Sequence, residues 1–573
     1  MCGFVGVLRP PSAGSVTEAE MKALLPWIRH RGPDQEGLLV LGDLGLAAAR
    51  LRIRGGDEGN QPLVAEDGRT IVAFNGELFF QPAVHGGTDR CDTPVFLDED
   101  GLDDDVLVGN MGALARYHVD EVRLDLARDP LGIKPLHVAE LDDGSVWFAS
   151  ELKVLLKAVP ALRRPDRLGL SELLQFHRPR TALPFHGVEA LPCGHDEEPV
   201  TERLAGEAAV DAVRRAWRGA AEHAADVDGP VSLLLSGGLD SSAVAAWAGR
   251  DDLLCLTGRF EGEAFDESEA AAAVAAHVGL EHEIVSLRDE DLVADLPDVI
   301  AALEMPIAGP GSLSLWRMAK RARAHGRVVL TGTGGDELFG GYARTALALG
   351  KAGRWTRGYE PLRSRIEAAG GDPSARLRAA FDRATDLRGV MHPDFVSMLP
   401  DPAPLQVGED ETLLEALLQE ERRGTLASLL HVEDRVTMAH GLEGRPVACL
   451  GRLPYVARRL HADWLIGPDG EGKRSLRAAL EGAIPESVRT DPRKRGFPTP
   501  FARAARGAGR ERIADWLGEQ RFRERGWWNV DACLALLDED RPGYDRALFA
   551  VLSWEWWARL FLDGDLFEGT THA

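Results

Sequence analysis

The chain has 573 residues, which is too long for a single hydrophobic core and predicts two or three domains. Hydrophobic residues make up 45% and charged residues 27% of the sequence, a composition typical of a soluble globular protein whose cores need no metal or disulfide. The formal net charge of -25 argues against a protein that wraps nucleic acid or lies on an anionic membrane.

The six cysteines form no Cys-x-x-Cys pair and no spacing with histidines that is typical of a zinc site. We therefore expect a reducing compartment, the cytoplasm. The sequence has no run of 18 apolar residues and no basic segment followed by an apolar one, so we expect neither a membrane span nor a targeting signal.

The first candidate for catalysis is Cys2. A cysteine is small enough for methionine aminopeptidase to remove Met1, which would make Cys2 the first residue of the mature chain. Its α-amine, with an ordinary pKa of about 8, could then take the proton of its own thiol. The resulting thiolate would be a nucleophile. A cysteine at position 2 does not indicate a function alone, so the hypothesis depends on the segments that follow.

Three such segments lie at residues 29–34 (RHRGPD), 49–53 (ARLRI) and 72–78 (VAFNGEL). Together with Cys2 they resemble class II glutamine amidotransferase domains, the N-terminal-nucleophile glutaminases. The resemblance implies that Cys2 attacks the side-chain amide of glutamine. It also implies that Asn75 and the backbone N–H of Gly76 form the oxyanion hole.

The same resemblance implies the residues that bind glutamine. Arg50 would bind its carboxylate, and Glu77 and Asp92 would bind its amino group. The sequence departs from the family between Asn75 and Asp92, where the chain is much shorter than usual. It also has Phe79 and Phe80 where an aromatic residue followed by Asn is common.

Residues 122–136 and 146–153 alternate apolar residues with turn residues, which predicts the strands and turns of a sandwich. Both segments resemble the second half of the glutaminase domain of asparagine synthetases. The stretch 179–195, rich in Pro, His and Gly, is expected to be the exit from the first domain. A linker and an Ala-rich helix follow over residues 196–229, so we place the boundary near residue 200.

Residues 231–242 (VSLLLSGGLDSS) predict a buried strand, a glycine turn and a helix N-terminus. Such a turn favours a phosphate or pyrophosphate, since it presents backbone N–H groups and the positive end of a helix dipole. The glycines would let the backbone approach the anion, the serine hydroxyls would donate to it, and Asp240 would bind Mg²⁺. The candidate residues are Ser236, Gly237, Gly238, Asp240, Ser241 and Ser242.

No Gly-Lys-Ser/Thr follows these glycines, so this is not a Walker loop. The string resembles the pyrophosphate loop of the ATP pyrophosphatase family, whose members adenylate a substrate and release pyrophosphate. Further strands at residues 253–260 and 282–285 alternate with Ala-rich helical segments. This order predicts a doubly wound parallel sheet with its ligand at the carboxyl ends of the strands.

Residues 328–342 (VVLTGTGGDELFGGY) again predict a strand that opens into glycines. Gly334 and Gly335 would help bind pyrophosphate, and Asp336 could share Mg²⁺ with Asp240, which adenylation needs to neutralise the departing pyrophosphate. The string closely resembles asparagine synthetases and their relatives, the β-lactam synthetases and lasso-peptide cyclases. Thr333 departs from it, because asparagine synthetases usually have an acidic residue there, and threonine cannot act as a general base at neutral pH.

The C-terminal region is predicted to be helical at residues 413–422, 431–442, 473–483 and 546–562. Residues 433–445 resemble the family string that borders the acyl-adenylate pocket, whereas residues 446–450 replace the usual continuation and suggest a changed pocket wall. Residues 472–477 and 493–500 also match. The resemblance implies that Lys473 stabilises charge on the phosphate and the developing oxyanion.

The resemblance to asparagine synthetases covers almost the whole chain. It implies an α/β protein in two parts: an N-terminal α+β sandwich over residues 1–200 and a doubly wound parallel sheet with an added helical region over 201–573. The implied activity is a glutamine-dependent amidotransferase that adenylates a carboxylate with ATP and Mg²⁺, with ammonia passing inside the protein. A homodimer is the family expectation.

Three alternatives stay open at this point. The enzyme could amidate a carboxylate of a specialised metabolite or peptide instead of aspartate, which Thr333 and residues 446–450 favour. It could close an internal amide, although an internal amine would need no glutaminase residues such as Cys2 and Arg50. It could also be a non-catalytic scaffold, which the aspartates at 240 and 336 argue against.

Overall fold

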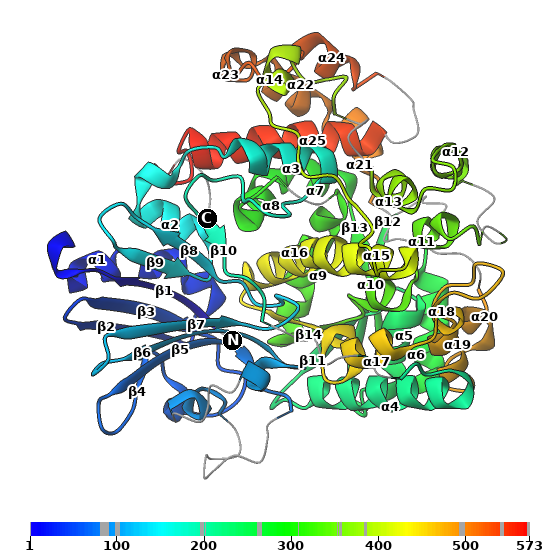
Figure 1. Ribbon diagram of the computed structural model, residues 1–573, viewed down its shortest axis with the longest axis horizontal. Coiled ribbons are helices and arrows are strands. Elements are labelled where there is room, and N and C mark those ends of the chain that lie inside the picture. Colours follow the sequence, from blue (N-terminus) through cyan, green and yellow to red (C-terminus); the bar gives the residue numbers. More distant parts are fainter. Residues whose placement is uncertain are drawn as a thin grey trace.

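The computed structural model describes residues 2–80, 91–97, 104–194, 200, 202–260, 266–306, 309–351, 353, 358–382, 387–491, 499–538 and 544–569. Two antiparallel sheets lie together at one side of the molecule, and a parallel sheet surrounded by helices lies at the other (Figure 1). The α/β class predicted from the sequence is confirmed.

The N-terminal part is built on the two antiparallel sheets. The six-stranded sheet has the order β10 (Glu189–Ala190), β8 (His137–Glu140), β9 (Val146–Ala149), β1 (Cys2–Leu8), β3 (Leu44–Arg50), β2 (Gln35–Leu41). The four-stranded sheet has the order β4 (Leu63–Val64), β5 (Thr70–Glu77), β6 (Met111–His118), β7 (Arg123–Arg128). The predicted sandwich is therefore present.

Successive side chains of β1 point to opposite faces of the six-stranded sheet, which explains how the layers of this part pack together. Phe4 joins a buried cluster with Ala73 and Ala115 that fills the space between the two sheets. Val5 and Val7 face the opposite side, where the six-stranded sheet is covered by α1 (Glu18–Lys22), α2 (Leu152–Ala158) and α3 (Arg167–Phe176). The four-stranded sheet thus buries one face of the six-stranded sheet, and the three helices bury the other.

Strand β10 changes the interpretation of residues 179–195. The sequence predicted this stretch as the exit from the first domain, but Glu189 pairs with Val138 and Ala190 with His137 at the edge of the six-stranded sheet. The stretch therefore still contributes to the first sheet, because two residues of extended backbone suffice to satisfy the edge of β8.

The second part contains a five-stranded parallel sheet of order β13–β12–β11–β14–β15. Its strands are β11 (Val231–Leu234), β12 (Leu254–Phe260), β13 (His282–Leu287), β14 (Val328–Thr331) and β15 (Glu443–Pro446). All four strand pairs are parallel, and the order reverses direction between β11 and β14. This is the predicted doubly wound sheet, and β11 and β14 lie at the switch point where such sheets bind ligands.

Helices cover both faces of the parallel sheet. Leu233 and Cys255 pack toward α4 (Gly206–Ala225), α5 (Leu239–Trp247) and α6 (Ser268–Val278). Leu254 and Val329 pack toward α8 (Leu296–Leu303), α9 (Gly311–His325) and α16 (Ala427–Met438). Because both faces are buried, these strands are continuous apolar runs, as the sequence predicted.

The remaining helices lie around the sheet and above α25 (Figure 1). They are α7 (Asp289–Ala294), α10 (Gly335–Phe339), α11 (Ala343–Ala348), α12 (Glu360–Ala368), α13 (Pro373–Phe381), α14 (Pro393–Ser397), α15 (Leu413–Glu420), α17 (Leu453–Arg459), α18 (Ala462–Leu465), α19 (Arg474–Ala479), α20 (Glu486–Arg489), α21 (Phe501–Arg506), α22 (Arg510–Gly518), α23 (Gln520–Glu524), α24 (Val530–Ala535) and α25 (Tyr544–Trp557). All four predicted C-terminal helices are present. None of the helices in the described ranges is long and apolar enough to cross a membrane.

Candidate active sites

Cys2 lies at the start of β1, in a small cavity at one end of the sandwich. Its register partner on β3 is Arg50, and its backbone N–H donates to Oδ1 of Asn75 at 3.2 Å. A cavity of about 30 Å³ is lined by Cys2, Arg50, Leu51, Ile53, Arg54, Gln61, Phe74, Gly76, Glu77, Cys91, Asp92 and Thr93. The structure thus brings together Cys2 and the glutamine-binding residues predicted from the sequence.

Asn75 supplies the donor that an oxyanion hole needs. The residue is fully buried, and within the described part of the chain its side-chain Nδ2 has no hydrogen-bond partner. A buried amide donor without a partner is unusual in a folded protein. Gly76 follows it at a place where a Cβ would collide with the carbonyl of Met111. The polypeptide therefore keeps one donor ready for an oxygen that the substrate can supply.

Arg50 is held in place by main-chain carbonyls. Its guanidinium donates to the carbonyl of Gly56 at 2.5 Å and that of Arg54 at 3.1 Å, and to Oδ1 of Asn60 at 3.2 Å. A side chain at Gly59 would collide with this guanidinium. Among the described residues Arg50 forms no ion pair with a carboxylate, and its hydrogen-bond partners are neutral oxygens, so the side chain suits a substrate carboxylate.

Glu77 and Asp92 place negative charge in the same cavity. Arg54 contacts Glu77 at 3.0 Å, and Oδ2 of Asp92 accepts from the backbone N–H of Leu78 at 3.0 Å. Burial, with the neighbouring Asp92, raises the pKa of Glu77 to about 7. The short connection between Asn75 and Asp92 therefore still delivers Asp92 to the cavity that holds Glu77.

The raised pKa of Glu77 predicts a pH-dependent affinity for glutamine. If Glu77 binds the substrate amine, its protonation below pH 7 removes the attraction. The KM for glutamine should then rise by up to about tenfold per pH unit below 7. Glutaminase kinetics between pH 5.5 and 8.5 would measure this. Glu77→Gln should show a high KM at every pH; an unchanged KM for this variant would exclude the role.

Sequence reasoning missed Gln61. Its Nε2 donates toward Sγ of Cys2 at 3.1 Å and to the carbonyl of Phe74 at 2.9 Å, and its Oε1 accepts from the N–H of Phe74 at 2.8 Å. Burial raises the pKa of the Cys2 thiol, so the thiol needs a base, and a donor beside the sulfur favours the thiolate. Gln61 lies outside the three quoted segments, so no local signal identified it.

The second candidate site is a cavity of about 1000 Å³ at the carboxyl ends of β11 and β14. Ser236, Gly237, Gly238, Asp240 and Ser241 line one wall. Gly237 has a φ of 69°, a left-handed conformation that favours glycine, and a Cβ there would meet Ala270 and Ala271. The hydroxyls of Ser236 and Ser241 are 3.1 Å apart. This is the predicted strand, glycine turn and helix N-terminus.

Lys473 lies between the two aspartates predicted to bind metal. Its Nζ pairs with Asp240 and lies 2.6 Å from Oδ1 of Asp336. Burial alone would lower the pKa of Lys473, but the two carboxylates raise it, so the ammonium stays charged. Glycine makes the room: a Cβ at Gly335 or Gly341 would collide with the carboxylate of Asp240 or Asp336 respectively.

The two aspartates fit a Mg²⁺ ion. One ammonium nitrogen reaches both carboxylates, so one cation can be shared between them. Within the described ranges no group of three or more His, Cys, Asp or Glu side chains is arranged to hold a metal. The other ligands would have to be phosphate oxygens and water, a combination that Mg²⁺ commonly takes.

Three of the predicted pyrophosphate residues do not line this cavity. Ser242 is fully buried on α5. Gly334, with a φ of 99°, begins α10 beside Cys449, and Gly335 leaves room for Asp240. Gly334 and Gly335 shape the turn that carries Asp336, whereas other residues of both motifs, Asp336 among them, line the cavity.

Residues 446–450 do not line the cavity themselves, although Cys449 packs against Thr333, which does. They are buried, and they form the end of β15 and the turn after it, packed against β14. The expectation of a changed pocket wall there was wrong, because this segment completes the edge of the parallel sheet. Residues 493–498 of the other matching string lie outside the described residues.

The N-terminal part reaches the large cavity. Phe176, His177 and Arg178 line it, and Arg178 pairs with Glu420 of α15. His177 has a φ of 57° and ends α3, which turns the chain toward the second part. The large cavity is therefore completed by residues from both parts of the chain.

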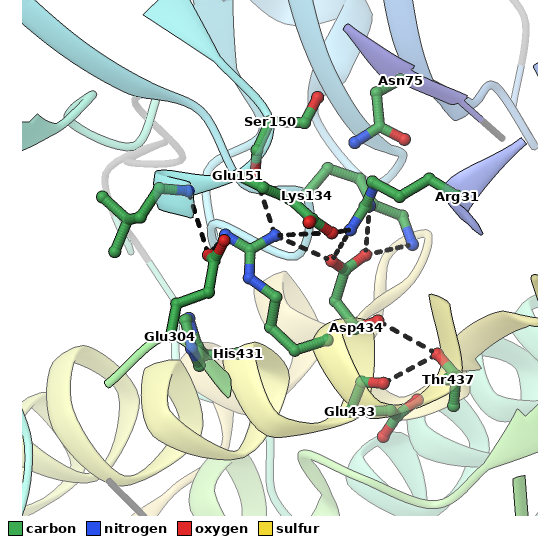
Figure 2. A network of polar contacts seen from close by, with 12 residues as sticks. Arg31, Asn75, Lys134, Ser150, Glu151, Glu304, His431, Glu433, Asp434 and Thr437 are labelled. Atoms are coloured by element: carbon green, nitrogen blue, oxygen red, sulfur yellow. Dashed lines mark hydrogen bonds and ion pairs between the residues drawn. The ribbon is translucent and has the colours of Figure 1, made fainter. Parts of the chain in front are cut away.

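A buried network of charges joins the two parts (Figure 2). Arg31 donates to the carboxylate of Asp434 at 2.8 and 3.1 Å and to Glu151 at 3.0 Å. Lys134 lies 3.4 Å from Asp434. Burial alone would raise the pKa of Asp434, but Arg31 and Lys134 hold it at about 2.

A second ion pair of the network lies within the second part of the chain and contacts main-chain groups of the first part. Arg435 contacts Glu304 at 3.0 Å and donates to the carbonyl of Ser150 at 2.9 Å. Glu304 accepts from the backbone N–H groups of Leu152 and Lys153 at 3.0 and 2.8 Å. Because removal of one partner from a buried pair costs about 3–5 kcal/mol, this network fixes how the two parts meet.

Known proteins match both parts of the chain. A family model described as asparagine synthase matches residues 212–559, and one described as glutamine amidotransferase domain matches residues 1–205. Asparagine synthetase (glutamine-hydrolyzing) 1 of Bacillus subtilis strain 168 is 28% identical over 97% of this chain and 96% of its own length. A putative asparagine synthetase of Mycobacterium bovis is 27% identical over 98% of each chain. Asparagine synthetase 2 of Lotus japonicus is 30% identical over 60% of each.

Proposed function

The chain belongs to the asparagine synthase family, and on that premise we propose that it hydrolyses glutamine at Cys2 and uses the ammonia to convert an adenylated aspartate into its amide. It is an ATP-dependent ligase with glutamine as the nitrogen donor. Free aspartate is the acceptor that the names of the relatives support. Closure of an internal amide would need no ammonia from glutamine, so it would not explain the cavity at Cys2.

The first half-reaction takes place at Cys2. The α-amine of Cys2 takes the thiol proton, and the thiolate attacks the amide carbon of glutamine. The Nδ2 of Asn75 and the N–H of Gly76 bind the oxygen that becomes negatively charged. Ammonia leaves, and water then hydrolyses the thioester to glutamate. Arg50 binds the carboxylate of glutamine, and Glu77 and Asp92 bind its amino group.

The second half-reaction takes place in the large cavity. The aspartate side chain attacks the α-phosphorus of ATP, which gives an acyl-AMP and pyrophosphate. Ser236, Gly237, Gly238 and Ser241 bind the pyrophosphate oxygens. Lys473 donates to the phosphate and to the oxygen of the acyl group. Asp240 and Asp336 would hold Mg²⁺, which supplies positive charge against the pyrophosphate.

The observation that supports this proposal is a buried series of contacts that leads from Cys2 to the wall of the large cavity. Nε of Arg31 donates to the carbonyl of Cys2 at 3.3 Å, and the same guanidinium binds Asp434. The residue before Asp434 is Glu433, which lines the large cavity. We propose that ammonia released at Cys2 crosses the protein along these residues, where burial would keep it from water and from becoming a non-nucleophilic ammonium.

We place the glutaminase domain at residues 1–200 and the ATP-using domain at 201–573. The route between the sites requires these domains to stay docked, which the buried charges of Figure 2 support. We further propose a cytoplasmic homodimer, as the family resemblance implies.

The test of this function is product analysis with ATP, Mg²⁺ and glutamine, with and without L-aspartate. We expect asparagine, glutamate, AMP and pyrophosphate in equal amounts, and aspartate-dependent release of pyrophosphate. Mass spectrometry and a pyrophosphate assay would measure them. Glutamate release with neither asparagine nor aspartate-dependent pyrophosphate would remove aspartate as the acceptor and leave the glutaminase intact.

A further inference from the structure

A buried carboxylate forms part of the wall of the large cavity, between the two active sites. Glu433 of α16 accepts hydrogen bonds from the hydroxyl of Thr331 at 2.9 and 3.0 Å and from that of Thr333 at 2.5 Å. It is 5% exposed and lines the cavity together with both threonines. The function described above gives this carboxylate no role.

Glu433 lies next to residues that contact the glutaminase part and next to residues of the large cavity. Its neighbour Asp434 binds Arg31 and Lys134 of the glutaminase part, and Figure 2 shows the two acidic side chains leaving the same turn of α16 in different directions. Thr333 belongs to the turn between β14 and α10 that carries Asp336. Glu433 thus lies where ammonia from Cys2 would enter the cavity of the acyl-AMP.

The chemistry of amide formation requires a proton acceptor at this place. When ammonia attacks the acyl carbon, the new C–N bond leaves a positively charged nitrogen with a proton to lose. The hydroxyl of Thr333 cannot ionise near neutral pH, and Asp240 and Asp336 are engaged with Lys473. Glu433 differs from these aspartates because its partners are neutral hydroxyls.

We propose that Glu433 is the general base of the amide-forming step, held in place by Thr331 and Thr333. Its carboxylate takes one proton from the nitrogen that has attacked the acyl carbon. The tetrahedral intermediate then collapses, the bond between the acyl carbon and the phosphate oxygen breaks, and AMP leaves. The proton passes from Glu433 to solvent. The proposal rests on the amidation function given above.

The surroundings of Glu433 suit a base. The pKa of Glu433 is raised above its ordinary value, because burial and the neighbouring Asp434 raise it more than the two threonine hydroxyls and Lys134 lower it. A carboxylate with a raised pKa binds a proton more strongly than an exposed one, which favours proton transfer from the attacking nitrogen. Cys449 also faces this carboxylate, and its own pKa is raised well above the usual value, so it stays neutral.

The test compares wild type with Glu433→Gln, using ATP, Mg²⁺, L-aspartate and ammonium chloride in place of glutamine. Aspartate-dependent exchange between ATP and pyrophosphate should stay close to the wild-type rate, and so should glutamine hydrolysis. Asparagine formation should fall by about 10²–10⁴-fold, the usual worth of a general base. At a fixed concentration of free ammonia, wild-type amide formation should fall as acid protonates Glu433, and the variant should lack this dependence.

Two further variants guard against a misfolded protein. Glu433→Asp keeps a carboxylate and should retain part of the activity. The double variant Glu433→Gln with Thr333→Glu returns a carboxylate to the same place, because the two side chains already touch, and should recover amide formation.

The outcomes separate cleanly. Equal loss of exchange and amide formation in Glu433→Gln would make Glu433 a structural residue and overturn the proposal, as would an unchanged rate of amide formation. If wild type itself shows no aspartate-dependent exchange, the proposed acceptor fails, and the base assigned to its amidation fails with it. That result differs from the others because it appears without any substitution.

Discussion

Replacing Cys2 with alanine should abolish glutamine-dependent amide formation while ammonia-dependent amide formation continues. In the proposed mechanism Cys2 provides both the nucleophile and, after removal of Met1, the amine that activates it. Loss of a covalent nucleophile should lower glutamate release by about 10³-fold or more. The large cavity, where we propose that ATP binds, is not lined by Cys2, so added ammonia should bypass the defect. Glutamate and asparagine formation, each with glutamine or with ammonium chloride, would measure this.

Cys91→Ala is the matched control, since Cys91 is the second thiol that lines the same cavity. It should leave glutamine use largely intact, because Cys91 is far from the chain terminus in sequence and has no amine of its own to activate it. If Cys2→Ala retained glutamine hydrolysis, or if Cys91→Ala lost it, the nucleophile would not be Cys2. Loss of the ammonia-dependent reaction in Cys2→Ala would instead indicate disturbed docking of the two parts.

Replacing Lys473 with methionine should stop adenylation without affecting glutamine hydrolysis. The ammonium contacts both Asp240 and Asp336, so its removal leaves two partly buried carboxylates without their shared cation. It also removes a donor to the phosphate, a kind of loss that costs about 10²–10³-fold in rate. Aspartate-dependent ATP–pyrophosphate exchange should fall by that factor, while glutamate release should not.

The same variant gives a readout of the metal site. Because Mg²⁺ would replace the missing ammonium between the two carboxylates, it should raise the Tm of Lys473→Met more than that of wild type. Lys351→Met is the control, since Lys351 pairs with Asp463 and a main-chain carbonyl away from the cavity. If Lys473→Met retained ATP–pyrophosphate exchange, Lys473 would act only as a counter-ion of the two aspartates. If Mg²⁺ raised the Tm of wild type and of Lys473→Met equally, this would argue against metal binding at the aspartates.

The buried network in Figure 2 explains why the two reactions can be coupled in one chain. Arg31 touches Cys2 and Asp434 at once, and Asp434 precedes Arg435, which binds Glu304 and the carbonyl of Ser150. Each charge is buried beside a partner on the other part of the protein. Separation of the two parts would leave several of these charged side chains exposed or without a partner, so the docked arrangement is the stable one.

Much of the fold and of the candidate sites could be predicted from the sequence because their signals are local. A strand that runs into glycines before a helix is recognisable in twelve consecutive residues, 231–242, and β11 and α5 lie there. Cys2, Arg50 and Asn75 were identified by family resemblance, and the structure brings them to one place. Strand β10 could not be predicted in this way, because a strand of two residues is too short to show an alternation of apolar and polar residues.

The sequence by itself determined the two kinds of core, the strand–turn–helix units and the chemical groups at their ends, since backbone sterics and hydrophobic periodicity act over a few residues. Only the tertiary structure decided which distant groups meet. Lys473 lies 233 positions from Asp240, Asp434 lies 403 from Arg31, and Glu433 lies 100 from Thr333. Such contacts depend on how helices pack on sheets and on the burial of paired charges, which no local pattern records. For that reason the local pattern could not show that Gly334 and Gly335 do not line the cavity, or that the hydroxyl of Thr333 donates to the carboxylate of Glu433.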